Sequence, residues 1–241
     1  MVSAAGPSGG SQTATARRLV ASLGGRYSRE LGIDLDSGGT GVDQWFCAAT
    51  LFGTRIGAPI AVRTYRVLVE AGVRTVLDAG ERRWEDLVAL LDAGGYARYD
   101  FRTATRLQKL AADVRARCRG TISTLATVSD PRALEAALDA FPGWGPTTVR
   151  IFLRELRDVW PGAQPPLDER ALRTARHLRL PISQRGSGQI AALRAVAELA
   201  QLDVRDLETA LVRLALVHRD MPACTGGPGC RKLVTETRAA G

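Results

Sequence analysis

The chain has 241 residues, 45% of them hydrophobic, which is enough for one large domain or two small ones with a real core. Its formal net charge of +8 suits a polyanionic partner such as nucleic acid. No stretch approaches the roughly 20 apolar residues of a membrane span, and the N-terminus lacks a signal-peptide pattern, so we expect a cytoplasmic protein without membrane association.

The first half of the chain is predicted to be helical after a short tail. Residues 1–12, rich in Gly, Ser and Ala, are expected to be disordered, and a helix is expected over residues 13–31. The glycine-rich stretch 36–41 then breaks the chain and is the first candidate domain boundary. Apolar residues recur at helical spacing in the segments that follow, namely 42–56, 59–70, 84–91 and 107–118.

A glycine-hinged turn, Gly94-Gly95-Tyr96-Ala97-Arg98-Tyr99, separates two of these helical segments. Its two tyrosines and its arginine make it a candidate surface for nucleic acid. The alternative is that both tyrosine rings belong to the hydrophobic core, where aromatic rings are common.

Residues 130–156 predict two helices joined by a tight turn. Pro131 and Pro146 suit first helical positions, and the turn between the helices reads Pro142-Gly143-Trp144-Gly145. Such a turn leaves main-chain N–H groups unpaired at the positive end of the second helix, where a phosphate can bind. An ordinary helix–helix loop is the alternative.

A proline-rich loop, residues 160–167, follows the second helix of this hairpin, and Asp168 opens the next helix at Glu169. Asp168 is either only the N-cap of that helix or a functional carboxylate as well, and the two roles are compatible.

Three more helices are expected over residues 169–179, 188–201 and 203–218, and no strand alternation is evident. The sequence therefore predicts an all-α protein of roughly ten helices.

The histidines and cysteines give weaker signals. His177 and His218 are expected to have packing or surface roles, because neither has a second ligand-type residue at metal spacing. Cys224 and Cys230 could pair with each other or share a metal, although free thiols are expected in a reducing compartment.

From Trp45 to about Cys230 the chain resembles the helix-hairpin-helix DNA glycosylase superfamily, which includes endonuclease III and the adenine glycosylase. The resemblance depends on the hairpin Phe141-Pro142-Gly143-Trp144-Gly145 and on the Gly/Pro-rich loop that leads to Asp168. Gly95-Tyr96-Ala97-Arg98 is also similar to the turn whose tyrosine enters the base stack in the adenine enzyme.

The resemblance implies an all-α fold of two helical lobes with a DNA cleft between them. A six-helix barrel lobe would span residues 41–162 and include the helix-hairpin-helix motif at 130–156. A discontinuous lobe would join residues 13–40 to residues 163–235.

The resemblance also implies functional residues. Asp168 would be catalytic, and Tyr96 would be the wedge that fills the gap left by a flipped base, with Arg55 as second choice. A monovalent cation, K⁺ or Na⁺, would be held by the main-chain carbonyls of Asp139, Phe141 and Trp144. The DNA backbone would be contacted at the hairpin and beside the wedge by Gly143, Trp144, Gly145, Thr147, Thr148, Arg150 and Arg98.

Three departures from the family pattern narrow the expected activity. Thr147 stands where members that also cut the abasic site have a lysine, and Schiff-base chemistry needs an amine. Ala48 stands where the adenine enzyme has a glutamate. Only Cys224 and Cys230 remain near the C-terminus, where iron–sulfur members have four cysteines, so a 4Fe–4S cluster is not expected.

The sequence thus favours a monomeric, monofunctional DNA glycosylase without AP lyase activity. It would remove a damaged or mismatched base from double-stranded DNA in base excision repair, and no cofactor would be required. One alternative is a non-catalytic helix-hairpin-helix protein that binds DNA or senses lesions. Another is a structural or protein-interaction module.

Overall fold

The computed structural model describes residues 7–54, 56–183 and 188–234, and it contains helices but no strand within those ranges. The all-α prediction is therefore confirmed for the described chain. Contacts divide the chain into two compact units, which we call the terminal unit (residues 1–26 and 166–241) and the central unit (residues 27–165). Each has its own hydrophobic core. No described helix is both long enough and apolar enough to cross a membrane.

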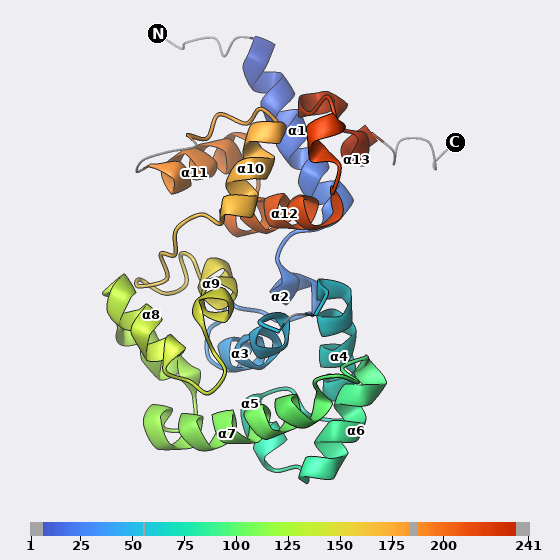
Figure 1. Cartoon of the computed structure of the whole chain (residues 1–241). Helices are drawn as coiled ribbons and strands as arrows, with labels where there is room; N and C mark the ends of the chain where they lie inside the picture. Colours follow the sequence, from blue (N-terminus) through green and yellow to red (C-terminus); the bar gives the residue numbers. More distant parts are fainter. Residues whose placement is uncertain (1–6, 55, 184–187, 235–241) are drawn as a thin grey trace. The chain divides into compact units, whose positions relative to one another are not determined.

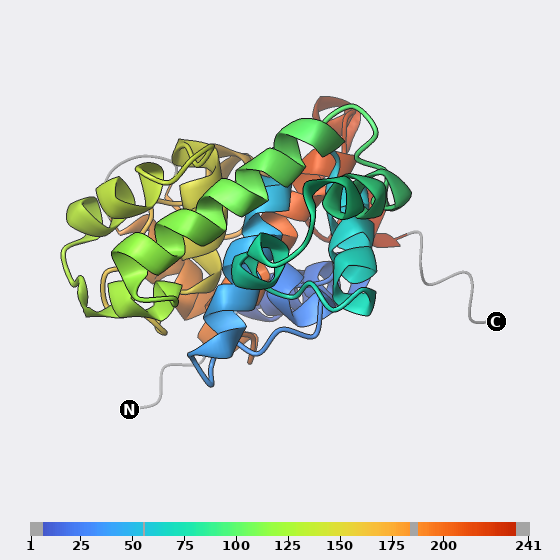
Figure 2. The same cartoon turned by 90° about the horizontal axis from the view of Figure 1, so that it is seen from below.

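The central unit is built around α3, which the other helices surround (Figure 1). Residues Trp45 to Leu51 of α3 are all buried, because this helix is apolar on nearly every side. Helices α4 and α9 pack against α3, and α7, the longest helix of this unit, packs against α5 and α6 (Figure 2). The helices are α2 (Tyr27–Glu30), α3 (Thr40–Phe52), α4 (Ala58–Glu70), α5 (Val76–Gly80), α6 (Trp84–Gly94), α7 (Asp100–Cys118), η1 (Ile122–Thr127), α8 (Pro131–Asp139) and α9 (Pro146–Glu155).

The terminal unit joins the two ends of the chain around α12, against which α1, α10 and α11 pack (Figure 1). Asp206 of α12 accepts hydrogen bonds from the Arg26 main-chain N–H at 2.9 Å and from Arg26 Nε at 3.2 Å, so it fixes the chain that leaves α1. The helices are α1 (Pro7–Leu23), α10 (Glu169–His177), α11 (Gln189–Leu199), α12 (Val204–Val217), η2 (Met221–Ala223), η3 (Gly227–Gly229) and α13 (Arg231–Val234).

The N-terminal part of the chain differs from the prediction in two ways. Helix α1 begins at Pro7, so residues 7–12 are helical rather than a disordered tail, because α1 packs against α11 and α12. Residues 1–6 lie outside the described residues. The single helix expected over residues 13–31 is two helices, since α1 ends before Gly24, whose φ is +78°.

The division between the units lies after Arg26 and after Pro165, whereas the sequence suggested boundaries after Thr40 and Gly162. Glu155 at the end of α9 explains the first difference. Its carboxylate oxygens accept the N–H groups of Tyr27 and Ser28, each at 2.9 Å, so the chain joins the central unit at α2. Burial raises the pKa of this carboxyl, and Arg154 and the N–H donors oppose that effect.

Candidate nucleic-acid interface

The hairpin between α8 and α9 is built by local sequence signals. Asp130 caps α8 through a side-chain oxygen that accepts the Ala133 N–H at 2.8 Å. Gly143 has a φ of +75°, a left-handed conformation that favours glycine, and Gly145 is the extended N-cap of α9. Pro146 then occupies the first turn of α9, where its missing N–H costs nothing.

Several main-chain N–H groups of this hairpin turn point away from internal acceptors. Those of Gly143, Gly145, Thr147 and Thr148 have no hydrogen-bond acceptor among the described residues. They lie at the N-terminus of α9, the positive end of its dipole. Gly143, Thr147 and Arg150 are exposed, so this side of the hairpin is open to a ligand.

Two of the residues predicted to contact DNA at the hairpin, Trp144 and Thr148, have buried side chains. Only their main-chain groups are left to contact a ligand. The Trp144 ring stacks on Phe46 at a centroid distance of 4.2 Å, and its Nε1 donates to Thr50 Oγ1 at 3.1 Å. Thr148 packs against Gly53 so closely that a Cβ built there would lie 1.9 Å from Thr148 Oγ1. These contacts anchor the turn to α3.

The carbonyls predicted to hold a monovalent cation lie at the end of α8 and in the turn. The Phe141 carbonyl accepts the Trp144 N–H at 3.0 Å. The neighbouring carbonyls of Ala137 and Ala140 both accept from the Arg117 guanidinium, each at 3.3 Å, so an arginine already balances the negative end of α8.

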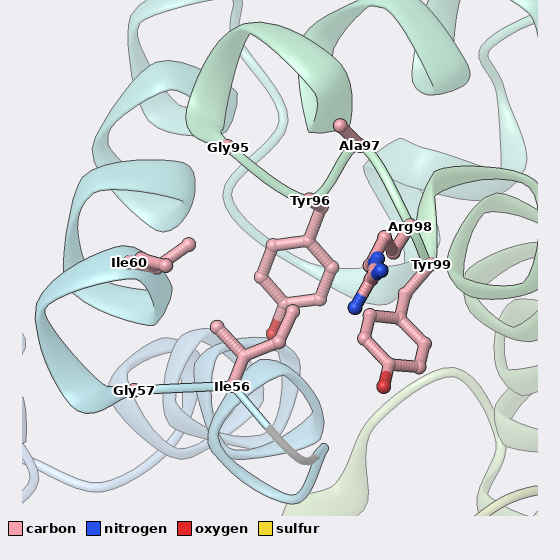
Figure 3. Close-up of a pocket in the computed structure, with 8 residues that line it drawn as sticks. All are labelled: Ile56, Gly57, Ile60, Gly95, Tyr96, Ala97, Arg98 and Tyr99. Carbon is pink, nitrogen blue, oxygen red and sulfur yellow. The ribbon is translucent and has the colours of Figure 1, made fainter.

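The turn after α6 lines a cavity of about 280 Å³ (Figure 3). Figure 3 shows the Tyr96 ring pointing towards Ile56, with Tyr99 on its other side. The lining residues are Ile56, Gly57, Ile60, Gly95, Tyr96, Ala97, Arg98 and Tyr99.

Tyr96 itself belongs to the hydrophobic core and has no exposed surface. Its hydroxyl donates to the Leu51 carbonyl at 2.5 Å and lies 3.0 Å from Thr54 Oγ1. Burial raises the pKa of Tyr96 to about 12, so the phenol is neutral at physiological pH. Tyr96 therefore ties the turn to the end of α3, whereas Arg98 is exposed.

Arg106 of α7 packs against the hairpin turn and lies near Tyr96, although it was not among the predicted site residues. A Cβ built on Gly143 would lie 2.3 Å from Arg106 Nε, so the guanidinium packs directly over the glycine. Burial lowers the pKa of Arg106, and the nearby Arg102 acts in the same direction, although an arginine keeps its charge under these conditions. The spacing of Arg102 and Arg106 by four residues was the one available signal.

The arginines around these two turns are not neutralised by carboxylates. Within the part of the chain that the structure describes, Arg98, Arg102, Arg106 and Arg150 form no ion pair. We call the hairpin turn 142–148 together with these four arginines the basic turn surface.

Asp168 is the N-cap of α10 in the terminal unit. Its Oδ1 accepts the Arg170 N–H at 2.7 Å, the side chain is half-buried, and Oδ2 has no hydrogen-bond partner among the described residues. The helix-capping role expected from the sequence is therefore present, and one carboxylate oxygen is left for other chemistry.

The remaining predicted site residues fall into two groups. Arg55 lies outside the described residues. His177 and His218 pack edge to face at a centroid distance of 5.1 Å, as the expected packing role requires, and they also lie beside Cys224 and Cys230 in the terminal unit. The sequence suggested a shared metal as one possibility for Cys224 and Cys230 but did not add the histidines, because His177 is far from the cysteines along the chain.

Comparison with protein-family models, curated proteins and solved structures finds no match to this chain.

Proposed function

We propose that the protein binds double-stranded DNA through the basic turn surface and acts as a monofunctional DNA glycosylase in base excision repair. The observation that carries this proposal is the group of hairpin N–H groups without acceptors beside the Arg106 guanidinium. The catalytic part of the proposal rests on Asp168 and on the resemblance of the hairpin, loop and aspartate to the helix-hairpin-helix glycosylases.

The basic turn surface has the chemistry that a DNA phosphate requires. Main-chain N–H groups at a helix N-terminus donate hydrogen bonds to anions, and the helix dipole favours negative charge there. A guanidinium adds a charged, forked donor. Contacts of this kind position a protein on the DNA backbone without reading its sequence, as a protein that scans for rare lesions requires.

Catalysis would use the carboxylate of Asp168. Moving the target base out of the DNA base stack costs a free energy of a few kcal/mol. Breaking its N-glycosidic bond then develops positive charge on the sugar. A carboxylate near that sugar stabilises the charge and orients or deprotonates the attacking water. Because Thr147 offers no amine, the reaction would stop at the abasic site.

The roles of the tyrosine turn and of a bound cation remain part of the proposal. The Tyr96 side chain is buried, and its hydroxyl donates a hydrogen bond to the Leu51 carbonyl. The ring would therefore have to leave the core in order to fill a gap in the DNA base stack. The exposed Arg98 would meet the strand more readily. A monovalent cation on the carbonyls of Asp139, Phe141 and Trp144 is supported only by the resemblance.

A non-catalytic DNA-binding or lesion-sensing protein is the second candidate. The buried position of Tyr96 favours it, because a phosphate-binding surface needs no mobile wedge. Both candidates predict salt-dependent DNA binding, and only the glycosylase predicts base release.

Base release separates the two candidates directly. Purified protein would be incubated with duplexes that carry uracil, thymine mismatches, 8-oxoguanine or alkylated bases, and the released base would be identified by mass spectrometry. We expect one class of modified or mismatched duplex to lose its base. Tight binding to the duplexes without release of any base would support the non-catalytic alternative instead.

A further inference from the structure

The terminal unit brings two histidines and two cysteines together from three segments of the chain. His177 is the last residue of α10, His218 follows α12, and Cys224 and Cys230 flank η3. One potential ligand atom from each of these residues lies within 4.8 Å of those from the other three. Two nitrogen and two sulfur donors at this spacing can surround a single ion.

Both imidazoles present a buried nitrogen without a hydrogen-bond partner. Within the described chain, Nε2 of His177 and Nε2 of His218 are buried and unpartnered. Buried polar atoms normally find a partner, so two orphaned nitrogens beside the same two thiols point to a ligand that both nitrogens bind.

The hydrogen bonds around the group favour metal-binding forms of its members. His218 Nδ1 lies 3.0 Å from Asp220 Oδ1, an arrangement in which Nδ1 carries the proton and Nε2 keeps a free lone pair. A carboxylate behind a metal-binding histidine orients the ring in this way. Cys224 Sγ accepts the Arg231 N–H at 3.4 Å, which supports a thiolate.

The loop between the cysteines is shaped by glycine. Gly226 has a φ of +67°, and a Cβ at this position would lie 2.3 Å from the His177 carbonyl oxygen. The loop can therefore approach the end of α10 closely. His218 is 2% exposed and Cys230 is fully buried, whereas His177 and Cys224 are partly exposed, so the group lies at the edge of the core of the terminal unit.

We propose that His177, His218, Cys224 and Cys230 bind one structural Zn²⁺, with both histidines coordinating through Nε2. Two imidazoles and two thiolates match the tetrahedral ligand set of structural zinc sites, and four protein ligands leave no open position for catalysis. The two thiols lose their protons to solvent on binding, so the two thiolates neutralise the ion. The zinc would hold the segment from η2 to α13 against α10 and α12.

A 4Fe–4S cluster fits this group less well. Each protein ligand of such a cluster binds a different iron atom, which needs a wider separation of donors than one ion does, and the usual ligands are four cysteines. Two thiolates and two imidazoles are instead a ligand set typical of structural zinc.

The test measures metal in the full chain, expressed without a histidine tag and dialysed against buffer that contains Zn²⁺ and then against metal-free buffer. We expect elemental analysis to find one zinc per chain. Replacement of the zinc by Co²⁺ should give the intense visible absorption of tetrahedral cobalt together with thiolate charge-transfer bands. This readout uses the wild-type chain and so does not depend on any variant. Absence of bound zinc and of this cobalt spectrum would overturn the proposal, as would iron–sulfur absorption or a Cys224–Cys230 disulfide in the purified protein.

Variants then assign the ligands. Cys230→Ser and His177→Gln should each weaken zinc retention and lower the Tm of the zinc-loaded protein, whereas Cys118→Ala in the central unit should keep one zinc per chain. Retention of zinc by both ligand variants would contradict the assignment. Because the readout is metal content, this result stands whether or not the protein releases bases from DNA.

Discussion

At the scale of single residues, Asp168 can combine a structural and a chemical role. One oxygen caps α10 through the Arg170 N–H, and the other has no partner among the described residues. Asparagine caps a helix about as well as aspartate does, so Asp168→Asn should keep the fold while it removes the negative charge.

Asp168→Asn is therefore expected to lower the rate of base release by about 100-fold or more, with DNA affinity changed by no more than a few fold. The rate would be measured on whichever duplex the wild-type protein processes. Glu169→Gln, which alters the adjacent exposed carboxylate, is the matched control and should stay active. Full activity of Asp168→Asn would remove this residue from the mechanism.

Arg106 places a positive charge directly beside the hairpin turn, because its guanidinium packs over Gly143. Arg106→Ala should weaken binding to any duplex by roughly tenfold, because one charge-assisted phosphate contact is lost, and should reduce the slope of log affinity against log salt by about 1. Binding would be titrated by fluorescence anisotropy at several salt concentrations.

Arg83→Ala provides the comparison for Arg106→Ala. Arg83 is an exposed arginine of the central unit that already pairs with Asp86 at 3.1 Å, so its loss should leave the salt slope unchanged. Equal effects of the two substitutions would mean that Arg106 contributes only to the general positive charge.

At the scale of elements, the two hairpin glycines should respond differently to alanine. Gly143 has a positive φ and lies beneath Arg106, so Gly143→Ala should destabilise the protein by about 1–2 kcal/mol and weaken DNA binding. Gly145 is extended, and a Cβ there meets nothing within 4 Å, so Gly145→Ala should largely keep the fold. It should still weaken DNA binding, because the methyl group would obstruct a phosphate at the N–H groups.

Urea unfolding and DNA titration of the two variants distinguish these effects. A Gly145→Ala protein with unchanged stability and unchanged DNA affinity would show that no phosphate approaches this turn.

Glu155 ties α2 to α9. Glu155→Ala should lower the free energy of unfolding by about 2–4 kcal/mol, because the N–H groups of Tyr27 and Ser28 would lose their acceptors in a buried site. Chemical denaturation would measure the change. Glu135→Ala, on the partly exposed side of α8, should change stability far less, and similar losses for both variants would contradict the role of Glu155.

The helices were more predictable than their contacts. Apolar spacing and cap residues predicted α4, α9 and α10 closely, since those signals are local. The same local signals could not reveal that Arg106 lies over Gly143 or that Tyr96 is buried under the end of α3. Those facts depend on packing between segments far apart in the sequence, as does the meeting of His177 with Cys224.

At the scale of the whole molecule, the residues proposed for DNA binding belong to one unit, and those proposed for catalysis and zinc binding belong to the other. The central unit carries the basic turn surface, and the terminal unit carries Asp168 and the histidine–cysteine group. The sequence predicted that the terminal unit is made of two separate chain segments. The first boundary nevertheless lies after Arg26 rather than after Thr40, because Glu155 accepts the Tyr27 N–H and so holds α2 in the central unit. Such a long-range hydrogen bond leaves no local pattern in the sequence.

The proposed activity is tested by a time course on a duplex that the protein processes, analysed for strand breaks with and without alkali and for adducts trapped by borohydride. A monofunctional glycosylase should leave abasic sites that become breaks only in alkali, and no trapped adduct, because Thr147 supplies no amine. Strand breaks without alkali together with a borohydride-trapped protein–DNA adduct would contradict the proposed activity.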